Sequence, residues 1–213
     1  MSVKLIHQSS SDLLKDIAHV ARVSNPENQI SNAPVNKLIR YLVKNKHWSP
    51  FEMVSVCLEI NTTRDIARQI LRHRSFSFQE FSQRYANVDD LWEVTYREAR
   101  GQDPDNRQNS VRLADGKIHE EWRVLQQNAW YAAKVAYDWA IEQGIAKEQA
   151  RAVLPEGMTP SRLYMHGTLR SWMHYIELRS GNGTQAEHQQ IAVESAAAIY
   201  PVFPMILDFV TEQ

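Results

Sequence analysis

The feature that most limits the fold is a long helical pattern in the second half of the chain. Its apolar residues recur at steps of four and three, the spacing of one face of an α-helix: Ile118, Trp122, Leu125, Ala129, Ala132, Ala136 and Trp139. Gly144 follows the last of them and can terminate a helix. The pattern predicts one long helix between about Ile118 and Gly144.

Strand signals occur in shorter segments. Residues 51–60 alternate between two sides, as a half-buried strand does. One side carries Val54, Val56, Leu58 and Ile60, and the other carries Met53, Ser55, Cys57 and Glu59. Two more extended segments are predicted at residues 76–85, where Phe76 and Phe78 alternate with polar side chains, and at residues 162–167.

Further helices are predicted around these strands. They cover residues 12–21, a segment from Pro34 through Val43, a segment from Thr62 or Thr63 to about His73, and residues 148–153, 169–178 and 187–200, where Pro201 and Pro204 must break or kink the last helix. Residues 86–115 are polar and irregular, and they form either an ordered functional loop or a mobile surface insertion. The mixture predicts a single α+β domain over residues 1–213, a β-sheet with flanking helices.

Composition excludes several classes of protein. The 24 Lys and Arg residues are balanced by 25 Asp and Glu, so the net charge is -1, whereas proteins that coat nucleic acid carry a clear positive excess. No apolar run approaches the roughly 20 residues that span a bilayer, and residues 1–7 lack the apolar core of a signal peptide. Cys57 is the only cysteine, so no intrachain disulfide can form, which fits a reducing cytoplasm.

Glycine usage excludes one common way of binding a dinucleotide. The chain has seven glycines, and none of them forms a G-x-G-x-x-G or phosphate-loop pattern. Any dinucleotide must therefore be held by side chains and helix ends rather than by a Rossmann turn. The histidines lack a tight H-x-x-x-H or cysteine partner set, so no metal site is predicted.

The densest chemistry lies in residues 72–84. This stretch holds three arginines, a histidine, a glutamate and three serines among phenylalanines. Guanidinium groups bind phosphate in a bidentate fork, and serine hydroxyls complete its shell. The stretch therefore suits a ligand with phosphates and a flat ring, although a solvated helix end followed by an amphipathic strand is the simpler interpretation.

Other cations have simpler explanations. Arg64, Arg68 and Arg72 lie four apart on one predicted helix face, where they repel each other unless an anion or an acidic partner lies among them. Asp65, Glu59 or Glu80 could be that partner. Taken alone, Arg151 is more often a salt-bridge residue, and His174 a satisfied core histidine.

Three separated blocks resemble the flavin-dependent thymidylate synthases. The first is Arg72-His73-Arg74, seven residues, then Ser82, with Gln69 before it and Arg84-Tyr85 after it. The second is His47-Trp48-Ser49-Pro50-Phe51-Glu52, similar to His-x-[Thr/Ser]-Pro-Phe-Glu. The third includes Arg151 in an Ala-Arg-x-x-Leu-Pro setting and the block from Thr168 to Arg179, followed by Gln185 and Glu187. Chance agreement of three blocks in matching order is improbable. Met53, Thr168 and His174 differ from the residues found in many members.

The resemblance implies a site residue by residue. Arg179 matches the residue that polarises the uracil. The implied dUMP-binding residues are Gln69, Ile70, Leu71, Arg72, Glu80, Phe81, Ser82, Gln83, Arg84, Arg151 and Arg179. The implied FAD-binding residues are Ser49, Arg72, His73, Arg74, Glu80, Thr168, Leu169, Arg170 and His174.

The resemblance also implies an activity. It is the reductive methylation of dUMP to dTMP, with methylenetetrahydrofolate as carbon donor, FAD as cofactor and NADPH as reductant, in a homotetramer with shared active sites. Two alternatives are a non-catalytic nucleotide- or RNA-binding module, which the net charge disfavours, and a flavin reductase without methyl transfer, which the nucleotide-gripping residues disfavour. Cys57 lies mid-strand near Glu59, so an inert thiol is expected. Neither the folate-binding residues nor the role of residues 86–115 is predicted.

Overall fold

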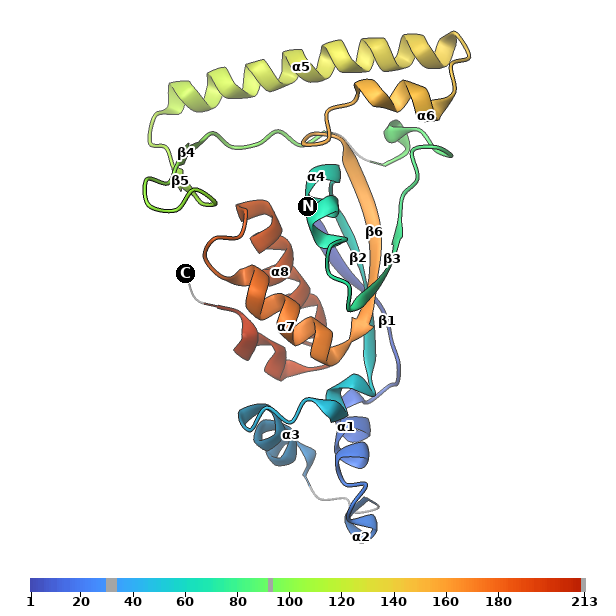
Figure 1. The fold of residues 1–213 in the computed structure, drawn as a ribbon, viewed down its shortest axis with the longest axis vertical. Helices are drawn as coiled ribbons and strands as arrows, with labels where there is room; N and C mark the ends of the chain where they lie inside the picture. The colour runs from blue at the N-terminus through green and yellow to red at the C-terminus, as the bar shows by residue number, and fades with distance from the viewer. Residues whose placement is uncertain (30–33, 92–93, 212–213) are drawn as a thin grey trace.

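The centre of the protein is an antiparallel sheet (Figure 1). The structure is a computed structural model, and it describes residues 1–29, 34–91 and 94–211. The strand order is β1-β2-β6-β3, with bounds Ser2–Gln8, Ser55–Thr63, Pro160–Thr168 and Phe76–Glu80. The two central strands pair along their whole length, from Ser55 opposite Thr168 to Thr63 opposite Pro160. The protein is therefore mixed α and β, as predicted.

Helices α7 (Leu169–Ser180) and α8 (Ala186–Ile199) pack against the sheet and bury its apolar side. Val56, Leu58 and Ile60 are fully buried, which confirms the side predicted from their alternation. Trp172 of α7 is also fully buried, and its indole N–H donates to the Val56 carbonyl oxygen at 3.1 Å. A buried polar group needs such a partner, so this bond fixes α7 on β2.

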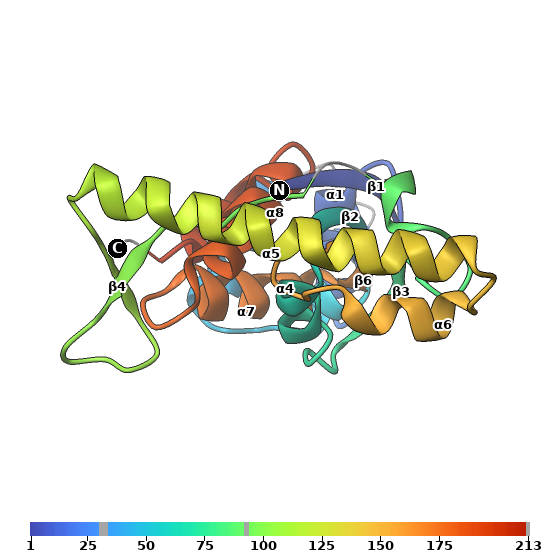
Figure 2. The ribbon, with the colours of Figure 1, turned by 90° about the horizontal axis from the view of Figure 1, so that it is seen from above.

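The other helices lie at the two ends of the molecule (Figure 1). At one end, α1 (Leu13–Ala21), α3 (Val35–Lys44) and the 3₁₀ turn η1 (Ser49–Glu52) extend the same core, and the short helix α2 (Pro26–Gln29) lies beyond them without buried residues. At the other end, α5 (Gly116–Glu142) crosses over α4 (Arg64–Ile70) and runs beside α6 (Lys147–Ala150), as Figure 2 shows from above. Two further 3₁₀ turns follow helices: η3 (Arg151–Val153) comes directly after α6, and η4 (Pro204–Phe209) comes after α8.

The long helix α5 is confirmed, but its apolar stripe is not covered within the chain. Ile118, Trp122, Leu125 and Trp139 are 44%, 43%, 60% and 58% exposed. The C-terminal half of the helix, from Trp130 to Ile141, packs on a second small core, which contains Val88, Tyr137, Ala140, Ala150 and Leu154. Gly144, with a φ of 73°, follows the helix in the left-handed region that glycine tolerates best.

Residues 86–115 are more regular than predicted. They contain the 3₁₀ turn η2 (Val88–Asp90) and a hairpin of β4 (Arg100–Gln102) and β5 (Ser110–Arg112). The Asp103 carboxylate organises the hairpin turn, because it accepts bonds from the backbone N–H groups of Asp105 and Asn106 and from the Asn109 amide. The description of this segment as wholly irregular is therefore wrong, and its described part is an ordered loop.

Several predicted boundaries also need correction. Residues 51–54 precede β2 because Pro50 opens the η1 turn, and β2 continues through Thr63, where α4 begins. Helix α4 ends at Ile70, before His73, and β3 ends at Glu80, so 81–85 are not in the strand. The edge strand β1 was missed because the alternation of Val3 and Leu5 with polar neighbours is short and breaks at Ile6, where the pairing with β2 shifts. Within the described part of the chain, no helix is long and apolar enough to span a membrane.

Candidate functional site

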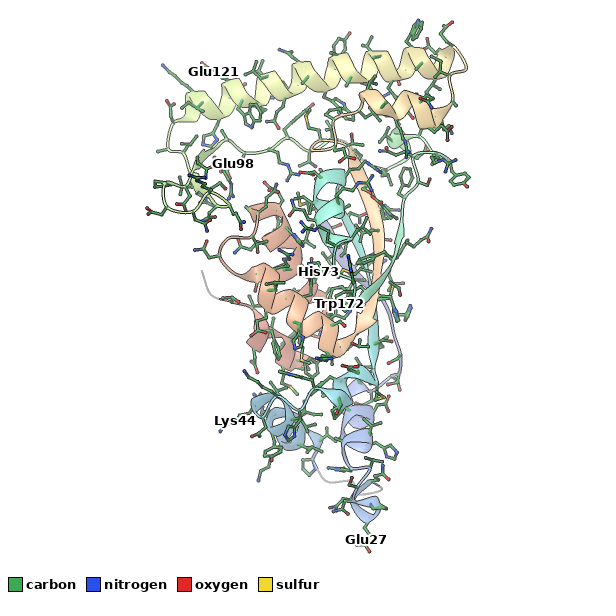
Figure 3. The ribbon with its side chains drawn as sticks, in the orientation of Figure 1. Glu27, Lys44, His73, Glu98, Glu121 and Trp172 are labelled. Atoms are coloured by element: carbon green, nitrogen blue, oxygen red, sulfur yellow. The ribbon has the colours of Figure 1, made fainter. Side chains whose placement is uncertain are left out.

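A cluster around the buried side chains of Tyr175 and His188, between α4, α7 and α8, brings together three of the predicted site residues, each half-buried (Figure 3 labels His73). Arg179 donates through Nε to Nε2 of His73 at 2.9 Å. The His73 ring meets the edge of the Tyr175 ring, with centroids 4.9 Å apart. Burial, helped by the charges of Arg179 and Arg72, lowers the pKa of His73 to about 4. His73 is thus a neutral hydrogen-bond acceptor at neutral pH, which holds the Arg179 guanidinium in place.

His188 of α8 extends this cluster to Gln69. Its side chain is fully buried, with Nε2 3.1 Å from the Tyr175 hydroxyl and Nδ1 3.2 Å from Gln69 Oε1. Burial, then Arg179 and His73, lower the pKa of His188 to about 3. Sequence reasoning missed both His188 and Tyr175. The signal was present, because His188 is in helical register with Ile191, Ala192 and Ser195 on the buried face of α8.

A second group of cations surrounds a pocket of about 360 Å³, lined by Arg64, Arg68, Gln83, Glu148, Arg151, Ala152, Leu154 and Glu156. Arg64 is 7% exposed and lies 3.7 Å from Glu80 and 3.8 Å from Glu156. Arg68 also pairs with Glu156, at 3.6 Å. Of the partners predicted for the stacked arginines, Glu80 is therefore correct, whereas Glu156 was not foreseen.

This pocket has an unused donor. The Gln83 side chain is 3% exposed, and its Nε2 has no hydrogen-bond partner among the described residues. A buried donor without a partner is costly, so an acceptor belongs there. Arg84 is exposed and pairs with Glu148 at 3.1 Å. None of the ion pairs between described residues includes Arg151, so its salt-bridge interpretation gains no support.

A third group lies at the start of α7. Thr168 caps this helix, because its hydroxyl accepts the Ser171 backbone N–H at 3.2 Å. Arg170 pairs with Glu52 through its terminal nitrogen, while its buried Nε has no partner among the described residues. The half-buried His174 packs its ring edge-on against Trp48, with centroids 5.3 Å apart. Ser49 begins the adjacent η1 turn.

The second and third groups lie at opposite ends of β3. Phe76 pairs opposite Gly167, beside the start of α7, and Glu80 pairs opposite Leu163, toward the arginine pocket. A five-residue strand spans roughly 17 Å, so one chain does not bring Arg170 and His174 together with Arg84 and Arg151. The remaining predicted residues vary in exposure: Ile70 and Leu169 are buried, Leu71, Phe81 and Ser82 are half-buried, and Arg72 and Arg74 are exposed.

Arg97, from the loop of unknown role, joins the loop to the buried cluster. It bonds to both Asp65 oxygens, at 2.9 and 3.0 Å, and lies 3.2 Å from Glu187. Asp65 is therefore not the partner of the stacked arginines. Glu98 and the nearby Glu121 (Figure 3) line a cavity of about 670 Å³ between the hairpin and α5, away from the predicted site residues.

The single thiol does not belong to any of these groups. Cys57 is 7% exposed in the middle of β2, and burial raises its pKa. A raised pKa keeps the thiol protonated and a poor nucleophile, as predicted. Within the described ranges, no three His, Cys, Asp or Glu side chains are placed to hold a metal ion together.

Comparison with known proteins shows the same family over almost the whole chain. Residues 4–205 match the Thy1 family, described as thymidylate synthase complementing protein. A "Probable flavin-dependent thymidylate synthase" of Paramecium bursaria Chlorella virus 1 is 48% identical over 190 residues, 89% of this chain and 87% of that protein. The flavin-dependent thymidylate synthase of Synechocystis sp. is 45% identical over 190 residues, 89% of this chain and 86% of that protein.

Solved structures are similar too. The UMP/dUMP methylase PolB from Streptomyces cacaoi, bound with 5-Br dUMP, has a TM-score of 0.83 and 29% identity, and the match covers 98% of this chain and 93% of that chain. Its complex with 5-Br UMP has a TM-score of 0.77 and 27% identity, over 98% of this chain and 92% of that chain. The fold described above is therefore shared along essentially its full length.

Proposed function

The chain belongs to the family of flavin-dependent thymidylate synthases, and from this premise we propose that it methylates dUMP to dTMP with FAD as cofactor. We further propose methylenetetrahydrofolate as carbon donor and NADPH as reductant. The single observation that carries the proposal is the Arg179–His73 pair, 2.9 Å long, next to the buried ring of His188, which also contacts Gln69.

The Arg179 guanidinium supports the methylation chemistry. It stays protonated at neutral pH and cannot act as a base. When a pyrimidine lies beside it, it stabilises the negative charge that develops as the ring becomes nucleophilic at C5. His73, neutral and half-buried, accepts the Arg179 Nε–H and fixes its orientation. The positioned guanidinium is thus aimed before the substrate reacts.

The other residues of the predicted nucleotide site are proposed to bind dUMP. Gln83 has a buried unpartnered donor, and Arg151 lines the same basic pocket, which suits an anionic phosphate. The proposed set is Gln69, Ile70, Leu71, Arg72, Glu80, Phe81, Ser82, Gln83, Arg84, Arg151 and Arg179.

The residues at the start of α7 fit a flavin. The buried unpartnered Nε–H of Arg170 is a donor for an acceptor atom of the cofactor, and the T-shaped His174–Trp48 pair offers flat surfaces. Bound FAD would supply the hydride for the methylene carbon. The proposed set is Ser49, Arg72, His73, Arg74, Glu80, Thr168, Leu169, Arg170 and His174.

We also propose a homotetramer with shared active sites. Two observations support it: the exposed apolar stripe of α5, and the separation of the flavin-fitting and phosphate-fitting residues along β3 within one chain. Exposed apolar patches of this kind mark interaction surfaces. A cytoplasmic location is part of the same proposal, since the one thiol is buried and unpaired. The non-catalytic binding module is not supported, because the relatives described above are named as synthases and a methylase.

The proposed function is tested by omission. Purified protein is incubated with dUMP, methylenetetrahydrofolate, NADPH and FAD, and dTMP is quantified by chromatography. We expect dTMP from the complete mixture and a loss of product when any one component is left out, with FAD removed from the protein beforehand. Product formed equally well without FAD would contradict the proposal, as would a complete mixture that makes none.

A further inference from the structure

We propose that His188 and Glu187 are positioning residues that fix the direction of the Gln69 side-chain amide, so that its N–H edge is presented to the nucleotide. The inference rests on the proposed function, because it concerns how Gln69 meets dUMP. It adds to that function two residues from α8 that do not touch the substrate themselves.

The first constraint on Gln69 comes from an acceptor-only group. Glu187 has a lowered pKa near Arg97, which lies 3.2 Å away, and an ionised carboxylate only accepts hydrogen bonds. Gln185 must therefore direct its Nε2 to Glu187 Oε2, at 2.9 Å. Its own Oε1 then faces Gln69 and accepts the Gln69 Nε2–H at 2.7 Å. Reversing this order would place two acceptors against each other.

The second constraint comes from the other side of the same amide. Gln69 Oε1 faces His188 Nδ1 at 3.2 Å, and a carbonyl oxygen cannot donate, so the proton must be on Nδ1. The neutral ring then has a bare Nε2, which accepts the Tyr175 hydroxyl proton at 3.1 Å. All donors and acceptors along this row are matched, as buried polar networks require. The hydrogen bonds from Glu187 through Gln185, Gln69 and His188 to Tyr175 therefore fit only one arrangement of donors and acceptors, and in it the Gln69 oxygen faces His188.

Burial makes the direction persistent. The His188 side chain has no solvent exposure, and after burial the charge that most lowers its pKa is that of Arg179 on α7. A positive neighbour and a dry surrounding keep the ring neutral. The ring therefore does not become a double donor at neutral pH, and the Gln69 oxygen stays held on the protein side.

The consequence lies at the substrate face of Gln69. Its amide nitrogen carries a second hydrogen, for which the described residues give no acceptor. Phosphate oxygens, ring carbonyls and sugar oxygens of dUMP are acceptors, so this hydrogen suits them. An amide turned the other way would present an oxygen and repel the same atoms. The direction of the row thus determines whether Gln69 helps or hinders nucleotide binding.

The test compares three variants in the FAD-loaded full-length protein. His188→Leu removes the donor to Gln69, His188→Asn restores an amide N–H near the position of Nδ1, and Tyr175→Phe removes the proton that Nε2 accepts. The dUMP dissociation constant is measured by calorimetry and compared with KM and kcat for dTMP formation. FAD affinity and thermal melting verify folding, and His166→Asn on β6, a half-buried histidine bonded to Ser55 at 3.1 Å, is the matched control.

We expect His188→Leu to raise the dUMP dissociation constant about tenfold, the effect of losing one ordered hydrogen bond. His188→Asn should stay within about threefold of the parent, Tyr175→Phe should lie between them, and KM should rise more than kcat falls. Parent-like binding by His188→Leu would overturn the inference, as would equal losses for Leu and Asn. If His188→Leu does not fold, Tyr175→Phe decides, and unchanged binding there overturns the inference. A parent that fails to bind dUMP overturns the proposed function itself.

Discussion

The buried histidine cluster and the long helix α5 are opposite kinds of structure within one chain. In the cluster, each polar atom of the His188 ring has a partner, and the ring is fully buried between α4, α7 and α8. Along α5, large apolar side chains stand in solvent, with Leu125 60% exposed. The polar atoms of the His188 ring find their partners within the chain, whereas the described residues leave the apolar stripe of α5 exposed.

This difference indicates that the histidine cluster and helix α5 have separate roles in function. A satisfied, desolvated network orients groups before a substrate arrives, and the cluster contains Arg179, His73 and Gln69. An exposed apolar stripe on a helix gains stability only when a second surface covers it. We therefore expect changes in the cluster to affect chemistry without changing assembly, and changes on α5 to affect assembly first.

The largest expected effect is on turnover by Arg179→Ala. Loss of one donor aimed at developing charge typically costs about 10²–10³ in rate, and His73 would also lose its partner. FAD binding and the sedimentation coefficient should be unchanged, as dialysis and ultracentrifugation can show. Near-normal dTMP formation by this variant would mean that Arg179 is a structural partner of His73 and nothing more.

A charge placed on α5 should act through assembly. Leu125→Asp puts a carboxylate in the apolar stripe, and a buried unpaired charge is strongly disfavoured. We expect a smaller species in analytical ultracentrifugation and a loss of activity of about tenfold or more, since a weakened interface costs at least ~1.4 kcal/mol. Asn128→Asp, an already polar and exposed position of the same helix, is the control. If the unsubstituted protein sediments as an active monomer, the apolar stripe of α5 has no role in assembly.

Acid should destabilise the protein through the cluster. The pKa of His188 is about 3 in the folded chain against an ordinary value of 6.5, so the unfolded chain binds a proton that the folded chain does not. Stability is full above about pH 6.5 and falls as pH decreases, by up to about 1.4 kcal/mol per pH unit for this residue. His73 acts in the same direction. Urea titrations between pH 7 and 5 should show the free energy of unfolding falling with pH. His188→Asn should make this pH dependence weaker. If the pH dependence is the same in the variant, His188 does not contribute to it.

The smallest expected effect is that of Cys57→Ala. The thiol is buried in β2, and burial raises its pKa, so it is not poised as a nucleophile. Activity should stay within several-fold of the parent, with a stability loss of about 1 kcal/mol for the small cavity. A folded variant that binds FAD and dUMP but makes no dTMP would point to a cysteine-based mechanism instead.

Sequence periodicity predicted most elements because alternation and helical spacing are local properties. It gave α5, α7, α8 and the central strands, including the buried side formed by Val56, Leu58 and Ile60. It failed for β1, whose short alternation from Ser2 to Leu5 breaks where the pairing with β2 shifts. It also failed at Phe51, which is buried from a 3₁₀ turn instead of a strand.

The site was predictable only where residue chemistry is visible in the sequence. Arg179, His73 and Gln69 were named in advance, and the structure brings them together. His188 was not named, although its helical register indicated the buried face of α8, because its partners Gln69 and Tyr175 come from α4 and α7, far away in the chain. The Arg97 ion pairs with Asp65 and Glu187 were equally hidden, since they join residues far apart in the chain.

The central claim is that flavin, and not the thiol, drives methylation in this chain. The most direct measurement is a single turnover without NADPH: FAD on the protein is reduced in the absence of oxygen, dUMP and methylenetetrahydrofolate are added, and flavin absorbance and dTMP are followed together. We expect about one dTMP formed for each flavin reoxidised, because the cofactor carries the hydride. Formation of dTMP while the flavin stays reduced, or reoxidation without dTMP, would contradict it.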